Sequence, residues 1–377
     1  MKLPIYLDYM STTPVDPRVA KKMMHCLTLE GDFGNSGSHT HIYGRKAAEI
    51  IEKSREQVAD LIHCEPQALI WVSGATEANN LAIKGAAYFY HRQGRHIVTL
   101  QTEHSSVLGP CAQLEKEGFE VTYLAPLSNG LIDLDHLQSA LRQDTILISV
   151  MHANNETGVI QDIAAIGNIA RERGILFHVD AAQSMGKIPI DLKTLPVDLM
   201  SITAHKIYGP KGIGALYLRQ KPRIHLVPLF HGGHQEMGLR SGTLPTHQIV
   251  GMGEACALAK QEMPTESTRL FSYRESLWGM LKTLGGVYLN GDWTSRLPGN
   301  LHVSFSGIDG KTLIESFSNL AISSGSACAS GNLKTSHVLQ AMGITETFSR
   351  SAIRFAFGRF TTESELAYIL KYIPISL

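Results

Sequence analysis

Residues 162–183 read DIAAIGNIARERGILFHVDAAQ, and this stretch contains one complete unit of a helix followed by a strand. Asp162 is suited to cap a helix whose apolar residues recur at helical spacing, and Gly174 is suited to end it. The apolar run Ile175–Val179 follows at once and predicts a buried strand. Asp180 comes directly after this run, so we expect a carboxylate at the carboxyl end of the strand.

Similar apolar runs recur between about residue 68 and residue 218, separated by amphipathic stretches. Repeated units of this kind predict an α/β fold, with a mostly parallel sheet in a three-layer α/β/α arrangement. Ligands bind at the carboxyl ends of the strands in such sheets, so the polar residues after each run are the candidates for a site. The predicted strands are Leu69–Val72, His96–Leu100, Val121–Leu124, Thr145–Val150, Ile175–Val179, Leu199–Ile202 and Ile213–Leu218.

The pattern changes after about residue 245 and predicts a smaller α+β domain. A helix from His247 to Glu262 is expected to lead into Pro264, followed by a second helical pattern. Strands are expected near Leu301–Phe305 and Ser351–Ala356, with a terminal helix over roughly Glu363–Tyr372. We therefore predict a large domain over residues 16–262, and a small domain formed by residues 1–15 and 263–377.

Composition excludes several classes of protein. Lys plus Arg and Asp plus Glu are both 34 in the 377 residues, so no basic excess points to direct nucleic-acid binding. No apolar run is long enough to span a membrane, and Pro4 and Asp8 interrupt the stretch that a signal peptide needs. The five cysteines are odd in number and widely spaced, which fits neither a disulfide framework nor a zinc site. We expect a cytoplasmic protein with no resident metal.

Three features after the predicted strands form a chemically specific set. The turn Ser73–Glu77 opens a helix, whose free amide groups suit an anion; an ordinary N-cap by Thr76 is the alternative. Asp180 suits a protonated heterocyclic nitrogen, or is a turn residue. Lys206 follows another strand and suits a Schiff base, or is a solvated lysine. An anion site, an aspartate and a fixed lysine together suit pyridoxal 5′-phosphate (PLP).

The chain closely resembles the class V, fold-type-I PLP enzymes, and among them the NifS/IscS-type cysteine desulfurases. The resemblance covers essentially the whole chain in order. The matching segments are Tyr6-Leu7-Asp8-Tyr9, Thr12-Thr13-Pro14, Ser73-Gly74-Ala75-Thr76-Glu77, Thr102-Glu103-His104, Asn154-Asn155-Glu156, His178-Val179-Asp180-Ala181, His205-Lys206-Ile207-Tyr208-Gly209-Pro210-Lys211-Gly212, Arg240-Ser241-Gly242-Thr243, Ser323-Ser324-Gly325-Ser326-Ala327-Cys328 and Ile353-Arg354-Phe355.

The resemblance implies a role for each matching residue. Lys206 would bind PLP covalently, Asp180 would pair with its ring nitrogen, and His104 would stack on the ring and assist proton transfer. Gln183 would hydrogen-bond the ring hydroxyl oxygen. Asn155 and Arg354 would hold the carboxylate of the substrate. The remaining residues expected to bind the cofactor, mainly at its phosphate, are Ala75, Thr76, Asn155, Thr203, His205 and, from the other subunit of a homodimer, Thr243.

Cys328 lies in a run of small polar residues, Ser323–Gly331, which we expect to be mobile and exposed. Its thiolate is suited to attack the sulfur of a bound L-cysteine, leaving L-alanine and a persulfide on Cys328. An incidental loop cysteine is the alternative. The resemblance implies sulfur delivery to an iron–sulfur scaffold protein, with a transient iron–sulfur contact through Cys328, or to a tRNA-thiolation protein. The other cysteines, which we interpret as packing residues, are Cys26, Cys64, Cys111 and Cys256.

The sequence also departs from the family pattern. Met10 stands where Ser would be expected and Ala182 where Thr would be, and the stretch with His234 and Met237 lacks an expected third Gly and an Arg; none of these changes removes a group that the chemistry requires. The chain stops at Leu377, earlier than housekeeping members, which puts scaffold binding in doubt. Two other readings stay open: a different class V enzyme, such as a selenocysteine lyase or an aminotransferase, and a sulfur-relay protein that has lost turnover.

Overall fold

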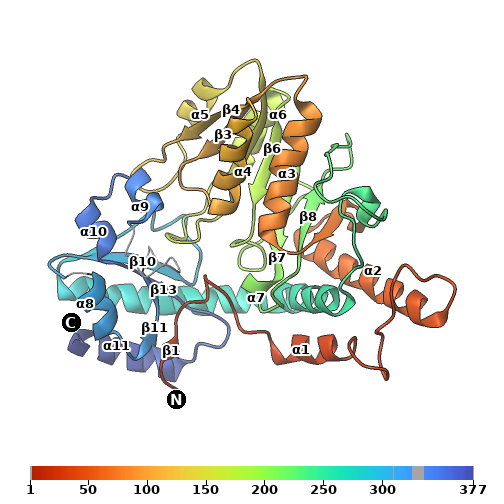
Figure 1. Cartoon of the computed structure of the whole chain (residues 1–377). Helices are drawn as coiled ribbons and strands as arrows, with labels where there is room; N and C mark the ends of the chain where they lie inside the picture. The colour runs from red at the N-terminus through yellow and green to blue at the C-terminus, as the bar shows by residue number, and fades with distance from the viewer. Residues whose placement is uncertain (1, 309, 325–334, 377) are drawn as a thin grey trace.

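The computed structural model describes residues 2–308, 310–324 and 335–376 (Figure 1). A seven-stranded sheet, in the order β2-β8-β7-β6-β5-β3-β4, lies at the centre of the larger part. Each end of these strands lies within one residue of the prediction, so all seven predicted strands are confirmed. The strands are β2 (Leu69–Val72), β3 (His96–Leu100), β4 (Glu120–Leu124), β5 (Thr145–Met151), β6 (Leu176–Asp180), β7 (Leu199–Thr203) and β8 (Gly214–Leu218).

The sheet is mostly parallel, as predicted, with one exception. The strands from β4 through β3, β5 and β6 to β7 pair in parallel, whereas β8 is antiparallel to both β7 and β2. The connection between Thr203 and Gly214 is too short for the helical crossover that a parallel pair requires. The chain therefore turns back, and β8 runs in the opposite direction.

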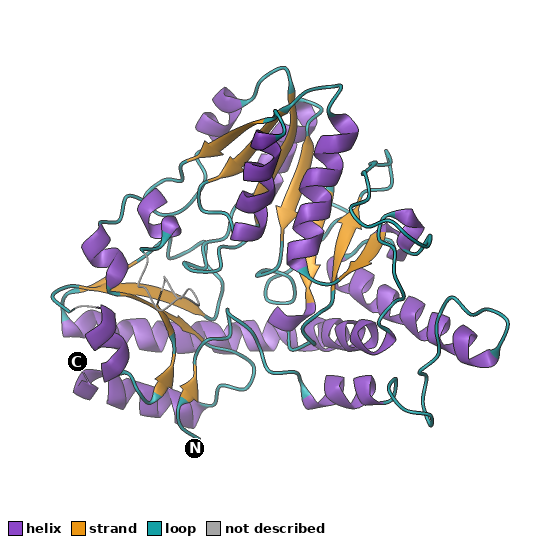
Figure 2. Cartoon of the chain, in the orientation of Figure 1, coloured by secondary structure: helices purple, strands orange, loops and turns teal. Residues whose placement is uncertain are grey.

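Helices cover both faces of this sheet (Figure 2). Alternate residues of β2 show the two faces: Trp71 packs with α2 and α7, whereas Ile70 packs with α3. Asp162 caps α6 by accepting from the amides of Ala164 and Ala165, and Gly174 has a φ of 67° after the helix, as predicted. The helices of this part are α1 (Pro17–Met24), α2 (Ile42–Ile62), α3 (Ala75–Tyr90), α4 (Ser105–Lys116), α5 (Leu134–Ala140) and α6 (Ile163–Glu172).

A second hydrophobic core surrounds a four-stranded sheet in the order β12-β13-β10-β9. Ile5 and Leu7 belong to this core, so the N-terminal residues pack with the C-terminal ones. Parallel β1 (Ile5–Tyr6) and β11 (Leu320–Ala321) lie beside the sheet. The other elements are β9 (Val287–Leu289), β10 (Asn300–Phe305), α8 (Gly310–Ser316), β12 (Ser323–Ser324), α9 (His337–Ala341), α10 (Glu346–Arg350), β13 (Ala352–Ala356) and α11 (Glu363–Ser376).

The helix α7 (Thr246–Leu281) runs through both cores, so the predicted end at Glu262 is wrong. Pro264 lies inside it, although an internal proline removes a hydrogen bond and costs ~3 kcal/mol. Ile249 before the proline belongs to the first core, and Leu277 after it belongs to the second. Packing of each half on its own core offsets that cost. We propose the domain boundary at residues 262/263, where the helix changes core.

An ion-pair network joins the two cores. Arg359 contacts Asp16 at 3.0 Å and Glu266 at 2.9 Å, and its guanidinium lies 4.2 Å from the ring centre of Tyr208. Asp16 also contacts Arg18 at 2.7 Å. Hydrogen bonds from Arg18 and Arg359 lower the pKa of Asp16 well below its usual range, because their effect is larger than that of burial, which raises the pKa.

We expect Asp16→Asn to lower the free energy of unfolding by about 3 kcal/mol at neutral pH, because it removes a buried carboxylate that pairs with both Arg18 and Arg359. The difference from wild type should shrink as the pH falls below about 4, since the lowered pKa contributes stability only while an unfolded aspartate would be ionised. Urea unfolding at several pH values measures this. Glu346→Gln, which breaks an exposed pair with Arg350, is the control and should cost under about 0.5 kcal/mol. Equal costs for the two variants would contradict the account.

Candidate active site

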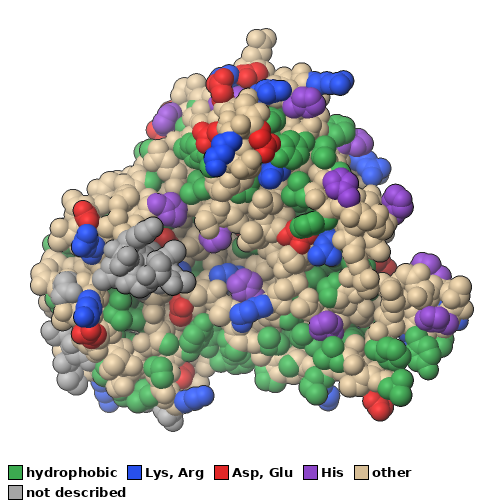
Figure 3. Space-filling model, in the orientation of Figure 1, with side chains coloured by type: hydrophobic (Ala, Val, Ile, Leu, Met, Phe, Trp, Pro, Cys, Tyr) green, Lys and Arg blue, Asp and Glu red, His purple; other side chains and the backbone are tan. Residues whose placement is uncertain are grey.

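A cleft of about 660 Å³ lies at the carboxyl ends of the parallel strands. Figure 3 shows the hollow near the centre of this face, with histidine and cationic side chains along it. The cleft brings together residues from both ends of the chain. The sequence-predicted site residues that line it are Ala75, Thr76, His104, Asn155, Asp180, Gln183, Thr203, His205, Lys206 and Arg354.

Lys206 ends a short 3-10 helix, Ala204–Lys206, that follows β7 directly. Its Nζ donates to the backbone oxygens of Met10 and Ser11, at 2.5 and 2.6 Å. Burial and the nearby cation of Arg354 lower the pKa of Lys206 to about 8, against an opposing effect of two aspartates. The alternative of a solvated surface lysine is therefore wrong, and the amine is available as a nucleophile near neutral pH.

Asp180 ends β6 and is buried. Its Oδ2 accepts from Asn79 Nδ2 at 2.8 Å, and its Oδ1 accepts from the amide of Ala182 at 2.9 Å. Two donors therefore fix the carboxylate in the cleft. The Ala182 bond is a turn contact, so the turn interpretation of Asp180 is confirmed, and its pairing with a cofactor stays a prediction.

His104 caps α4 with its ring, because Nδ1 accepts from the amide of Ser106 at 3.2 Å. Desolvation, with Lys206 and His337 nearby, lowers the pKa of His104 against the effect of Asp180. The ring is therefore neutral near pH 7, with its proton on Nε2 because Nδ1 is an acceptor. Asn79 Nδ2 bonds both Ser106 Oγ and Asp180, so one amide side chain links the histidine to the aspartate.

The start of α3 lines the cleft with free amide groups of a kind that suits an anion. Gly74 occupies the N-cap position with a φ of 155° and no side-chain capping bond, so capping by Thr76 is wrong. A Cβ on Gly214 would lie 2.8 Å from Gly74 Cα, so only glycine allows this close approach. Thr76 and Thr203 present hydroxyls here. Burial and Lys206 lower the pKa of His205 to about 4, and this neutral ring bonds Thr12 Oγ1 at 3.1 Å.

Arg354 reaches the cleft from β13 and is buried. Its Nη2 contacts Asp8 Oδ1 and Ser11 Oγ, both at 2.6 Å, and its Nη1 donates to the backbone oxygen of Asn155. Gln183 Nε2 donates to the Met10 oxygen at 2.9 Å. A guanidinium is thus held beside Lys206 by the N-terminal segment.

Two predicted residues are not brought into this cleft. Thr243 is exposed in the loop before α7 and is not among the lining residues. Cys328 lies outside the described residues, although Ser323 of β12 lines the cleft. Among the other cysteines, Cys26, Cys111 and Cys256 are buried and Cys64 is half-buried, which agrees with packing roles.

Two residues that hold the predicted site residues in place, Asn79 and Asp8, were not predicted from the sequence as parts of the site. Asn79 lies one helical turn beyond Thr76, so a search of the second turn of α3 would have found it. Asp8 stands within a matching segment, yet its ion pair with Arg354 joins residues 346 positions apart. No local pattern indicates such a contact.

The donor set of the cleft fits PLP. An anion site with two hydroxyls and a helix N-terminus, a fixed carboxylate and a poorly solvated amine match the phosphate, ring nitrogen and aldehyde of that cofactor. Every one of these groups lines the same cleft.

Comparison with known proteins agrees with this geometry. The family model described as aminotransferase class-V matches residues 5–369. The chain belongs to the class-V aminotransferase family. Enzymes of this class depend on PLP, the cofactor that the donor set of the cleft fits.

Relatives of this class-V chain are similar over its whole length. Proteins named cysteine desulfurase IscS from Enterobacter sp. (strain 638) and Aeromonas hydrophila are 58% and 57% identical over 377 residues, covering all of this chain and 93% of each relative. A solved structure titled "NIFS-LIKE PROTEIN" has a TM-score of 0.91 at 36% identity and covers 98% of both chains. Another, titled "SspA in complex with cysteine", has a TM-score of 0.83 at 38% identity, covering 95% of this chain and 100% of that one.

Helix length and hydropathy bear on membrane insertion. Among the described residues, no helix combines the length and the apolar character that crossing a bilayer requires.

The lowered pKa of Lys206 predicts its reactivity. We expect acylation of Lys206 in the cofactor-free protein to have its midpoint near pH 8, because burial favours the neutral amine. In urea the midpoint should move toward about 10.4, the ordinary value for lysine. Peptide mass spectrometry after brief labelling over a pH series measures both. An identical midpoint in the folded and unfolded protein would contradict the assigned environment of Lys206.

Proposed function

We propose that this class-V chain is a cysteine desulfurase that converts L-cysteine to L-alanine and transfers the sulfur to Cys328. The observation that carries the proposal is the convergence of Lys206, Asp180 and Arg354 in one cleft. This set supplies a covalent anchor, a ring partner and a carboxylate partner. The names of the relatives at 58% and 57% identity, and the cysteine complex of a structural neighbour, support cysteine as the substrate.

Different residues of the cleft would bind different parts of PLP. When bound, PLP withdraws electrons from the α-carbon of an amino acid. Thr76, Thr203 and His205, with the first amides of α3, would hold its phosphate. Asp180 would hold a proton on the ring nitrogen, and Gln183 would donate to the ring oxygen. We also propose that Thr243 reaches this site from the second subunit of a homodimer.

The substrate carboxylate would lie between Arg354 and Asn155. Arg354 already has one nitrogen on Asp8 and one on the backbone of Asn155, so its plane is fixed before substrate arrives. A planar guanidinium suits a carboxylate better than a lysine does. This contact would set the orientation of the substrate α-carbon relative to Lys206.

Two groups would move protons in the cleft. The Lys206 amine, with its pKa near 8, exchanges protons readily near neutral pH. His104 carries its proton on Nε2, because its Nδ1 is occupied by Ser106. The network from Asp180 through Asn79 and Ser106 fixes that tautomer.

The sulfur step would use Cys328. Its thiolate attacks the sulfur of the bound cysteine; the S–S bond forms as the Cβ–S bond breaks, and the electron pair passes to the substrate carbon, which is later protonated to alanine. The products therefore balance as L-alanine and a Cys328 persulfide. Ser324 of β12 pairs with Ile353, next to Arg354, and four residue steps reach at most about 14 Å from there to Cys328.

The persulfide would then pass to an acceptor. We propose an iron–sulfur scaffold protein or a tRNA-thiolation protein as acceptor, in the cytoplasm. The names of the relatives support a desulfurase and do not distinguish between these acceptors.

Cys328→Ser tests this function. With PLP and L-cysteine, wild type should release alanine and sulfide in equal amounts in the presence of a thiol reductant, whereas the variant should fall to the rate measured without enzyme, because no thiolate accepts the sulfur. Cys64→Ser, at a half-buried cysteine of a packing type, is the matched control and should turn over like wild type. Equal turnover by Cys328→Ser would identify a lyase that needs no acceptor thiol, and an inactive wild type would favour a relay protein.

A further inference from the structure

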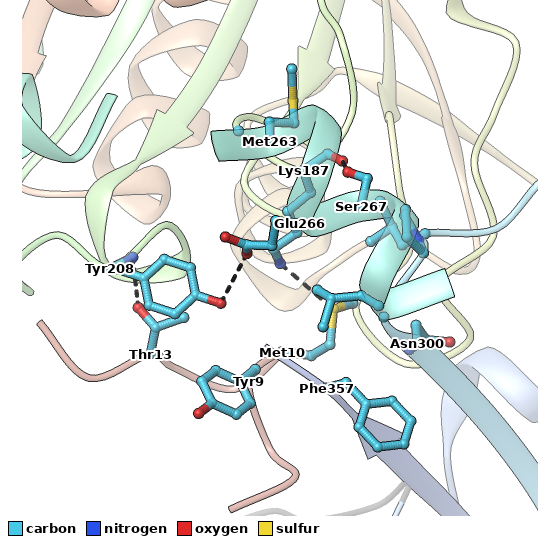
Figure 4. Close-up of a pocket in the computed structure, with 15 residues that line it drawn as sticks. Tyr9, Met10, Thr13, Lys187, Tyr208, Met263, Glu266, Ser267, Asn300 and Phe357 are labelled. Carbon is cyan, nitrogen blue, oxygen red and sulfur yellow. Dashed lines mark hydrogen bonds between the residues drawn. The ribbon is translucent and has the colours of Figure 1, made fainter. Parts of the chain in front are cut away.

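A small cavity of about 30 Å³ lies behind the floor of the cleft. Figure 4 shows residues that line it, among them Lys187, Glu266, Tyr208 and Met10. Its volume suits one or two water molecules rather than a larger ligand. One of the residues that line the cavity is a lysine, Lys187, and its ammonium lies between the cavity and the cleft.

Lys187 contacts the cleft through Gln183. Its Nζ donates to Gln183 Oε1 at 2.9 Å and lies 3.6 Å from Met10 Sδ. A lysine ammonium is only a donor, so the amide oxygen of Gln183 faces Lys187 while this lysine is protonated. The amide nitrogen then faces the other way, where it donates to the Met10 oxygen at 2.9 Å. The same oxygen accepts from Lys206.

The charges around Lys187 show that this ammonium is poorly solvated. Burial and the cations Lys206 and Arg354 lower the pKa of Lys187 to about 7, and Glu266 is the acidic group that opposes them. The hydrogen bond to Gln183 therefore replaces water that the ammonium has lost.

We propose that Lys187 is a positioning residue of the cofactor site, which fixes the Gln183 amide so that its NH₂ group is the face presented to the cleft. The inference rests on the proposed function, because it assigns that NH₂ group to the bound cofactor. Without Lys187 only the bond from Gln183 Nε2 to the Met10 oxygen still opposes a 180° turn of the amide, and a turned amide would set its oxygen against the cofactor oxygen without a proton between them. Binding should weaken, because a buried acceptor is left unpaired.

A double-mutant cycle tests the proposal. We expect Lys187→Met and Gln183→Leu each to raise the dissociation constant of PLP by about tenfold, measured by titrating cofactor-free protein. The double variant should bind no more weakly than Gln183→Leu alone, since Lys187 acts only through that amide. Lys193→Met, at an exposed lysine, is the matched control and should bind like wild type. Additive effects of the two changes, or unchanged binding by Lys187→Met, would overturn the proposal.

A second readout needs no cofactor. In protein labelled with ¹⁵N-glutamine, the side-chain amide signals of Gln183 are those lost in Gln183→Leu. They should shift in Lys187→Met and stay in place in Lys193→Met; unchanged signals in Lys187→Met would overturn the proposal. If wild type does not bind PLP, the proposed function fails, yet these signals still decide whether Lys187 orients Gln183. Lys187→Gln, whose amide accepts as well as donates, should act in the same direction and replaces Lys187→Met if that variant does not fold.

Discussion

The site depends on the segment of residues 8–13, which is hydrogen-bonded to both halves of the molecule. Asp8 holds Arg354 from the second sheet, whereas the backbone oxygens of Met10 and Ser11 hold Lys206 from the first. Thr13 accepts from the amide of Tyr208 at 2.8 Å and donates to the His205 oxygen at 3.0 Å. Because one segment makes all these contacts, the lysine and the arginine are held at a fixed separation, although they belong to different sheets.

Crowding of cations around this segment sets the chemistry of the cleft. Arg354 opposes protonation of both Lys206 and Lys187, Lys206 also opposes that of Lys187, and burial removes the water that would screen these charges. The pKa of Lys206 falls to about 8 and that of Lys187 to about 7, while His205 stays neutral. An amine with its pKa lowered to about 8, beside a fixed guanidinium, suits a covalent anchor and a carboxylate partner, so the same crowding supports both proposed roles.

Local sequence patterns predicted the elements whose formation depends mainly on residues near one another in the sequence. The strands of the large sheet were within one residue of their predicted ends, because buried strands need continuous apolar runs. Helix α7 continues through Pro264, which a local rule forbids, because each half packs on a different core. In the site, Lys206 and Asp180 follow strands and were predicted. Asp8 pairs with Arg354, which lies 346 positions away in the sequence. This pairing was not predicted, because no local sequence pattern indicates a contact between residues so far apart.

The proposed role of Lys206 as the covalent anchor for PLP can be measured by trapping the bond. Protein loaded with PLP is reduced with borohydride, which makes any lysine–cofactor bond permanent, and then digested and mapped by mass spectrometry. We expect the cofactor on the peptide that contains Lys206. Lys187 lies behind the floor of the same cleft and Lys211 lines it, so both are available as rival anchors. Cofactor found on either of those lysines, with Lys206 unmodified, would contradict the account.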